Sequence, residues 1–311
     1  MALTTPASTG SRTARSMTAG LTRHRSNTIN RLIELALVAA LVVTMLVLVV
    51  LVVDLLQRSW PLWADRGVGF LTDGLNASSA GAAGVSSAIK GTVVLCVIVA
   101  VVSFPLGIAC AVYLEEYAGR TRFARWTRVN VRNLAGVPSI VYGLVGLGMF
   151  VNVMHVGRNV FAGGLALSAL VLPIVVITAS EALRAVPRSI REGALGVGAT
   201  PWETVRSHVL PAAAPGILTG TVIALARAAG EAAPILLVGA ATGLLATGEQ
   251  GLIEQLTGPF TALPAVIFSY ARQTGEEFRQ VTAAASLVLL VLVLAMNSFA
   301  IWLRNRYDRK W

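Results

Sequence analysis

Charged residues are scarce in this chain of 311 residues: Asp, Glu, Lys and Arg make up 13% of it, whereas 55% of the residues are hydrophobic. An ordinary soluble domain carries about 25% charged residues, so this composition excludes that class. An apolar excess of this size, arranged in long runs, is typical of an integral membrane protein.

Cysteine, histidine and lysine are also rare, and each shortage excludes a kind of site. The two cysteines, Cys96 and Cys110, fall in one apolar run about 21 Å apart along a helix, which is too far for a disulfide. The three histidines lie in different segments, so no metal site is predicted. Neither Lys90 nor Lys310 stands in a Walker-type phosphate loop, so ATP hydrolysis is not expected from this chain.

Six runs lack charge, or nearly so, over the roughly 20 residues that a helix needs to cross a bilayer. The sequence therefore predicts an all-α integral membrane protein with six transmembrane helices in a domain covering 32–303. The predicted spans are about 35–56, 89–114, 133–154, 160–182, 216–242 and 281–303. The basic segment 1–31 has no acidic residue and is predicted to be a disordered cytoplasmic tail, and 304–311 is a second basic tail.

Arginines gather in alternate connections between the spans: before the first span, after the second, after the fourth and after the sixth. By the positive-inside rule, this distribution predicts that both termini are cytoplasmic. The formal net charge of +10 is then explained mainly by topology, and no nucleic-acid partner is expected.

The fifth predicted span contains two charges in an otherwise apolar stretch, LARAAGEAAPIL. Arg227 should lie near the bilayer midplane, where a charge costs at least about 2.5 kcal/mol. Glu231 falls one turn later on the same face and can pair with it. Pro234 lacks an N–H, leaves the carbonyl of Gly230 without its helical partner and is expected to kink the helix.

We interpret Arg227, Glu231 and Pro234 as a substrate path. An arginine offers an oxyanion a positive charge and a fork of donors, and the glutamate would hold its orientation. The alternative is a purely structural Arg–Glu pair at a helix interface.

The segment 183–215 is the longest predicted cytoplasmic loop, and prolines punctuate it. We expect two short helices joined by a turn near Gly198, the second opened by a capping box of Thr200 and Glu203. Two short helices under a membrane are typical of a docking device, and a structured connector is the alternative. This segment is called the coupling segment below.

The coupling segment resembles the coupling motif of ABC importer permeases: Glu-Ala-Ala, three residues, Gly, nine residues, Ile, one residue, Leu-Pro. The corresponding positions are Glu192, Gly193, Ala194, Gly198, His208, Leu210 and Pro211. Gly193 replaces an alanine of the motif and His208 replaces its isoleucine.

Further blocks resemble the permeases of the bacterial phosphate-specific importer. They are FPLGIACAVYLEEYAG at 104–119, LAGVPSIVYGL at 134–144 and ARAAGEAAPILL at 226–237. The glutamate followed by Ala-Ala-Pro, and LPAVIFSYA before the last span, are similar to the A-type member of that permease pair.

The resemblance implies a type I ABC importer permease fold in the bacterial plasma (inner) membrane. It implies a heterodimer with a homologous permease, two ATPase subunits that use ATP and Mg, and an extracytoplasmic phosphate-binding protein. This chain itself would bind no cofactor. The resemblance also places the charges of the fifth span on a phosphate path, and it assigns ATPase coupling to the motif positions, to which we add Arg188 as a polar contact.

Two alternatives stay open within transport: a stand-alone secondary anion transporter using Arg227, Glu231 and Pro234, and an ABC permease for another oxyanion. A membrane enzyme is less favoured because no nucleophile stands near a base. Glu115 and Glu116 are interpreted as a solvated helix end. The glycines of one run are expected to serve close helix packing in lipid, and they are Gly136, Gly143, Gly146 and Gly148.

Overall fold

The computed structural model describes residues 27–119, 121–240 and 258–307, and the regular elements in these ranges are all helices. The chain divides into two compact units, 1–54 and 55–311, which are described separately. In the described ranges, five helices are long and apolar enough to cross a membrane, or six if one bent pair counts as a span. The predicted all-α membrane fold is confirmed. Most of the predicted tails, and residues 241 and 242 of the fifth span, lie outside the described residues.

Helix α2, Asn27–Arg66, begins in the first unit and contains the predicted first span. Most of its apolar side chains in residues 30–54 are exposed, including those of Leu35, Leu41 and Val49. A surface so apolar requires lipid or another protein chain to cover it, because water solvates it poorly.

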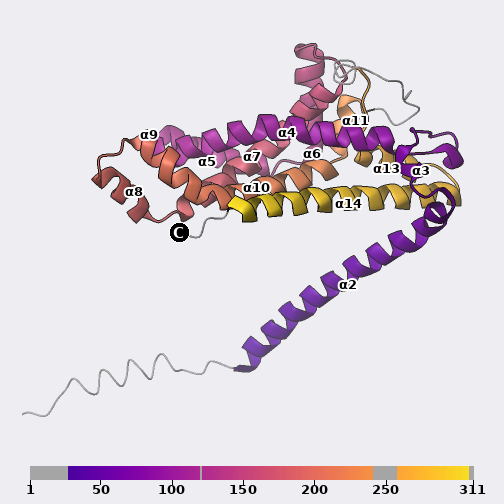
Figure 1. Cartoon of the computed structure of the whole chain (residues 1–311), viewed down its shortest axis with the longest axis horizontal. Helices are drawn as coiled ribbons and strands as arrows, with labels where there is room; N and C mark the ends of the chain where they lie inside the picture. Colours follow the sequence, from indigo (N-terminus) through magenta and orange to yellow (C-terminus); the bar gives the residue numbers. More distant parts are fainter. Residues whose placement is uncertain (1–26, 120, 241–257, 308–311) are drawn as a thin grey trace, which may run out of the picture. The chain divides into compact units, whose positions relative to one another are not determined.

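Four long helices form the body of the second unit. They are α4, Ser86–Val112; α7, Val160–Ala185; α10, Leu210–Gly230; and α14, Glu276–Tyr307. Helix α7 packs against both α4 and α10, and α10 packs against α14 (Figure 1). Glycines permit this close approach, since a Cβ on Gly107 would clash with Val175 and one on Gly220 with Thr178.

The predicted third span, 133–154, is not one straight helix. Helix α5, Arg122–Ala135, is followed by α6, Ser139–Val145, and the π-helix η3, Gly146–Val153, and the axis bends by 105° between them. Pro138 accounts for the bend, because the residue before a proline avoids the helical region. The apolar pattern runs through the bend and therefore did not reveal it.

Two of the four glycines in this region pack closely, as predicted. A Cβ on Gly143 would stand 2.8 Å from the Cα of Pro234, in helix α11, Ala233–Val238, and one on Gly146 would stand 2.6 Å from the Cβ of Ala166. Gly148 has nothing within 4 Å, so its side of the helix is open.

The coupling segment contains helix α8, Arg188–Gly196, helix α9, Pro201–Thr204, and the π-helix η4, Val205–Val209. The predicted capping box is confirmed: Thr200 Oγ1 accepts from Glu203 N at 3.3 Å, and Glu203 Oε2 accepts from Thr200 N at 2.8 Å. The second short helix is not separate, because the helical run continues from Pro201 to Gly230.

The opposite end of the second unit has a core of its own. It contains α3, Gly69–Thr72, the 3-10 turn η1, Ala80–Ala82, and α13, Leu263–Ala271. The Thr92 hydroxyl accepts a hydrogen bond from Leu263 N at 2.9 Å, and the buried Tyr270 hydroxyl donates to Gly84 O at 3.0 Å. These bonds hold α13 against α4 and its preceding loop.

Candidate functional site

The fifth predicted span breaks beside its charged pair. Helix α10 ends at Gly230, Glu231 has an extended backbone with φ −81° and ψ 114°, and α11 begins at Ala233. Pro234 explains the break, since it has no N–H for the carbonyl of Gly230 and lies in the first turn of α11, where proline is tolerated. The sequence predicted a kink at this carbonyl, and the structure has a complete break.

Arg227 and Glu231 form the predicted ion pair across the end of α10. The Nε atom of Arg227 lies 3.3 Å from Oε1 of Glu231, and the side chains are 48% and 19% exposed. No described residue accepts a hydrogen bond from Nη1 or Nη2 of Arg227. The pair thus orients the guanidinium while leaving its outer donors unused.

Arg227 lies on a face of α10 that the described residues leave uncovered. Ile223 and Gly230, at helical spacing from it, are exposed as well, whereas Ala224 and Ala228 are buried in the core. The uncovered face therefore presents one cation next to one carboxylate, with apolar and small residues around them.

Pro234 is placed differently from the other two residues of the predicted path. It is buried, and its Cα lies 2.8 Å from the position that a Cβ on Gly143 would take. In the structure it ends α10 and seats α11 against α6, and it is not exposed beside the guanidinium.

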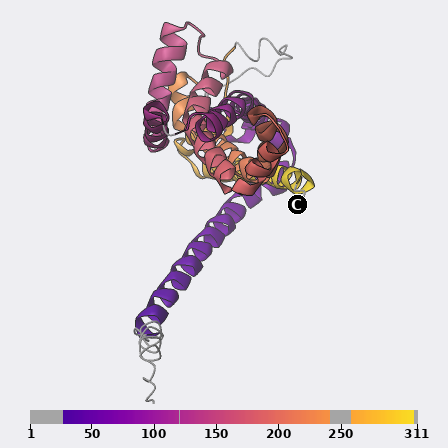
Figure 2. The same ribbon diagram turned by 90° about the vertical axis from the view of Figure 1, so that its left-hand side faces the viewer.

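The predicted coupling residues divide into surface and interior positions. Those that are exposed are Arg188, Glu192, Gly193, Gly198 and Pro211, whereas Ala194 is buried and Leu210 is half-buried. Figure 2 views the second unit from the end that carries α8 and α9. The turn between these helices has Gly198 at φ +93°, a left-handed conformation that favours glycine.

Three exposed apolar side chains on the coupling segment were not predicted as part of its surface. Val197 is 86% exposed, Trp202 57% and Leu195 49%. The sequence pattern that could have indicated this surface was the presence of large apolar residues beside glycines in a loop. Together with the charged Arg188 and Glu192, they form a mixed apolar and charged surface of the kind that docks proteins.

Comparisons with known proteins decide the family. The family described as "Binding-protein-dependent transport system inner membrane component" matches residues 103–311, more than half of the chain. The chain belongs to this family. As an inner membrane component, it is part of a transport system, and the resemblance noted in its sequence is confirmed.

Two relatives of this inner membrane component are named phosphate transport system permease protein PstA. The one from Xylella fastidiosa is 35% identical over 227 residues, covering 72% of this chain and 76% of the relative. The one from Mycobacterium leprae is 38% identical over 221 residues, covering 70% and 69%.

The fold also matches a solved ABC importer. A chain in the crystal structure of a bacterial alginate ABC transporter, in complex with its pentasaccharide-bound periplasmic protein, aligns with a TM-score of 0.63 and 15% identity. The alignment covers 93% of this chain and 99% of that chain. The predicted ABC importer permease fold is therefore confirmed.

The expectation that Glu115 and Glu116 form a solvated helix end is wrong for this inner membrane component. Each side chain is 10% exposed and ion-paired: Glu115 with Arg184 at 2.7 Å and Glu116 with Arg191 at 2.7 Å. Two adjacent acids precede a helix rich in arginine, and this local pattern could have suggested the weaker contact of Glu115 with Arg128 at 3.5 Å. The partners at 2.7 Å, Arg184 and Arg191, lie 69 and 75 residues away, and no local pattern reveals them.

The described residues contain no group of three His, Cys, Asp or Glu side chains that could hold a metal ion. Some of the charged side chains in the described residues of the inner membrane component form ion pairs, including those of Arg227, Glu115 and Glu116. Its candidate functional regions are therefore the open Arg227–Glu231 pair and the exposed coupling segment.

Proposed function

We propose that this chain is the transmembrane permease subunit of an ATP-driven importer of inorganic phosphate. Membership of the inner membrane component family and the similarity to phosphate transport permeases support this function. The observation that carries it is the half-exposed Arg227, which Glu231 orients at a break in the fifth span.

The geometry of the pair suits an oxyanion. Only Nε of Arg227 donates to Glu231, so the two terminal amino groups are available to a ligand. A guanidinium binds phosphate oxygens through two parallel N–H donors, and such charge-assisted bonds are about twice as strong as neutral ones. When no anion is bound, Glu231 balances the positive charge.

A second permease is needed to complete the path. One arginine paired with one glutamate has no net charge and cannot neutralise a phosphate dianion. The face of α10 with Ile223, Arg227 and Gly230 is exposed in the part of the chain that the structure describes. We infer that a homologous permease faces it as the other half of a heterodimer and supplies further donors.

Energy comes from separate subunits in this proposal. The exposed coupling surface, with Arg188, Glu192, Val197 and Trp202, docks in an ATPase that uses ATP and Mg. A phosphate-binding protein delivers the substrate from outside, and two ATPase subunits complete the complex. The location is the bacterial plasma membrane, with both termini cytoplasmic.

The test is uptake of radiolabelled phosphate by cells that lack this permease and carry either the wild-type gene or Arg227→Gln. We expect uptake to fall about 10- to 100-fold, because a hydrogen bond to a charged group contributes about 1.5–3 kcal/mol. Membrane insertion and complex assembly are checked in the same cells.

The matched control is Arg279→Gln, which breaks another arginine–glutamate pair. Arg279 contacts Glu276 at 3.2 Å, but both side chains are more than 60% exposed, at 68% and 65%. Uptake should stay at the wild-type level in this variant. Normal uptake by an assembled Arg227→Gln complex would show that the arginine is structural, and competition by sulfate as strong as by phosphate would assign the importer to another oxyanion.

A further inference from the structure

Two adjacent glutamates lie at the end of α4 in the π-helix η2, Tyr113–Tyr117. The wider turn is closed by Ala118 N, which donates to Tyr113 O at 2.8 Å. Both carboxylates, 10% exposed, face arginines of other helices. We call Glu115 and Glu116 the two-glutamate anchor. Short π-helical segments are frequent at functional sites.

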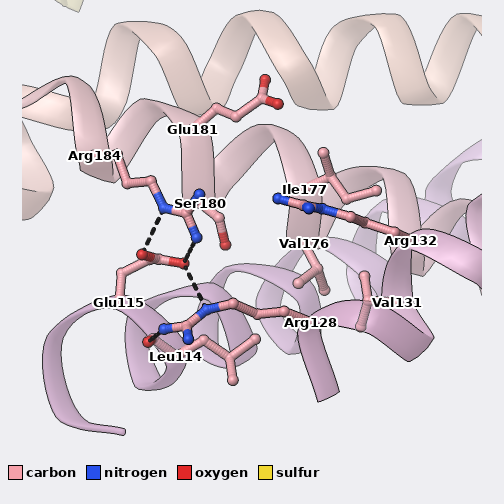
Figure 3. Close-up of a pocket in the computed structure, with 10 residues that line it drawn as sticks. All are labelled: Leu114, Glu115, Arg128, Val131, Arg132, Val176, Ile177, Ser180, Glu181 and Arg184. Atoms are coloured by element: carbon pink, nitrogen blue, oxygen red, sulfur yellow. Dashed lines mark hydrogen bonds and ion pairs between the residues drawn. The ribbon is translucent and has the colours of Figure 1, made fainter. Parts of the chain in front are cut away.

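Glu115 holds two helices. Arg184, in the last turn of α7, donates from Nε at 2.7 Å and from Nη2 at 2.8 Å, so this pair is bidentate. Arg128 of α5 reaches the same carboxylate at 3.5 Å and also donates to the carbonyl of Leu114. Figure 3 shows the two arginines approaching Glu115 from two sides, next to a cavity of about 40 Å³.

Glu116 holds the coupling segment. Arg191 of α8 donates to its carboxylate from Nε at 3.1 and 3.3 Å and from Nη2 at 2.7 Å. The same guanidinium donates to Val186 O and to Leu183 O, both at 2.9 Å. Every nitrogen of Arg191 is thus engaged, and of its five N–H donors only one, on Nη1, has no partner among the described residues.

No other side chain of α8 forms a hydrogen bond with another helix in the described part of the chain. Helix α8 packs on α9 and η4, and Ile190 contacts an apolar cluster that includes Leu183 and Val209. Apolar contacts of this kind allow small sliding, whereas a bidentate charged pair fixes direction as well as distance. In the described residues, the Glu116–Arg191 pair is therefore the directional contact between α8 and the end of α4.

We propose that Glu116 and Arg191 are positioning residues that transmit movement of α8 to α4, while Glu115 carries it on to α5 and α7 through Arg128 and Arg184. This inference rests on the proposed function, in which an ATPase docks on α8. In this proposal Arg191 acts inside the permease, where it connects the docking of the ATPase on α8 with the movement of the transmembrane helices. It makes no contact with ATPase or substrate.

The experiment uses the whole complex, purified through a tag on this chain and placed in proteoliposomes with its phosphate-binding protein. Phosphate transported per ATP hydrolysed is measured for wild type, Glu116→Gln, Arg191→Gln and the double variant. We expect each single variant to lower this ratio about tenfold while ATPase subunits still co-purify and hydrolysis continues. The double variant should be no worse than the singles, because both remove the same link.

Two further variants keep the result interpretable. Arg191→Lys retains the charge without the fork and should give an intermediate ratio. Arg125→Gln, an exposed arginine of α5, should leave the ratio unchanged. The proposal is overturned by an unchanged ratio in both single variants, by effects that multiply in the double variant, or by loss of the ATPase subunits from the variant complexes.

Failure of the proposed function gives a different result. A wild-type complex without ATPase subunits, or without ATP-dependent phosphate transport, would overturn the importer assignment and this inference with it. A wild-type complex that couples normally, together with unaffected variants, overturns the transmission role alone.

Discussion

Two arginine–glutamate pairs in this chain differ in how much of the arginine is engaged. Arg227 contacts Glu231, four residues away, through one hydrogen bond of 3.3 Å, and its side chain is 48% exposed. Arg191 reaches Glu116 over 75 residues of sequence, makes five hydrogen bonds and is 22% exposed.

The difference separates an arginine with unused donors from an arginine whose three nitrogens are all engaged. A guanidinium has five N–H donors, and those not used inside the chain are available to a ligand. Arg227 keeps its outer donors, so its pair is open, whereas Arg191 uses all three nitrogens, so its pair is closed. The same two residue types thus form an open pair in one place and a closed pair in the other.

Stability measurements on the two pairs give the largest expected contrast. Arg191→Gln leaves a mostly buried Glu116 without its partner and should lower the free energy of unfolding by about 3 kcal/mol. Arg227→Gln should cost less than about 1 kcal/mol, because exposed pairs contribute little. Unfolding by SDS in mixed micelles measures both, and equal losses would remove the distinction between closed and open pairs.

The position of the open pair depends on how α11 packs against α6 after the helix break. A substitution of Gly143, which lies in this contact, tests that dependence. An added Cβ would meet the backbone of Pro234 at 2.8 Å, so Gly143→Ala should destabilise the chain by about 1–3 kcal/mol. Gly148→Ala is the control, because nothing lies within 4 Å of that position. The same unfolding titration applies, and similar effects at the two glycines would contradict the close α6–α11 contact.

The smallest expected effect concerns the turn that follows the closed pair. Gly198 has φ +93°, so Gly198→Ala should cost about 1–2 kcal/mol of stability through backbone strain. Gly193 lies within α8 with open space around it. Gly193→Ala should therefore leave the free energy of unfolding unchanged or raise it by up to about 1 kcal/mol. The midpoint of thermal unfolding in detergent compares them, and a tolerated alanine at Gly198 would show that this turn relaxes freely.

Much of the architecture followed from the sequence alone. The apolar runs predicted an all-α membrane protein, and Pro234 located the break in the fifth span to the right carbonyl. Spacing along one helix paired Arg227 with Glu231, and Thr200 with Glu203 formed the expected capping box. These features are local, so helical periodicity and proline chemistry determine them without knowledge of the neighbours.

Only the tertiary structure decided what lies across helices. The structure shows that the third span bends at Pro138 and that Val197 and Trp202 are exposed on the coupling segment. It also shows that Glu115 and Glu116 are ion-paired and mostly buried, not solvated. Such features depend on which helices pack against each other. The apolar pattern of a helix does not specify its packing partner, so it could not predict these features. Charge pairs spanning 69 and 75 residues form because packing brings the ends of α4, α7 and α8 together, where unpaired buried charges would be costly.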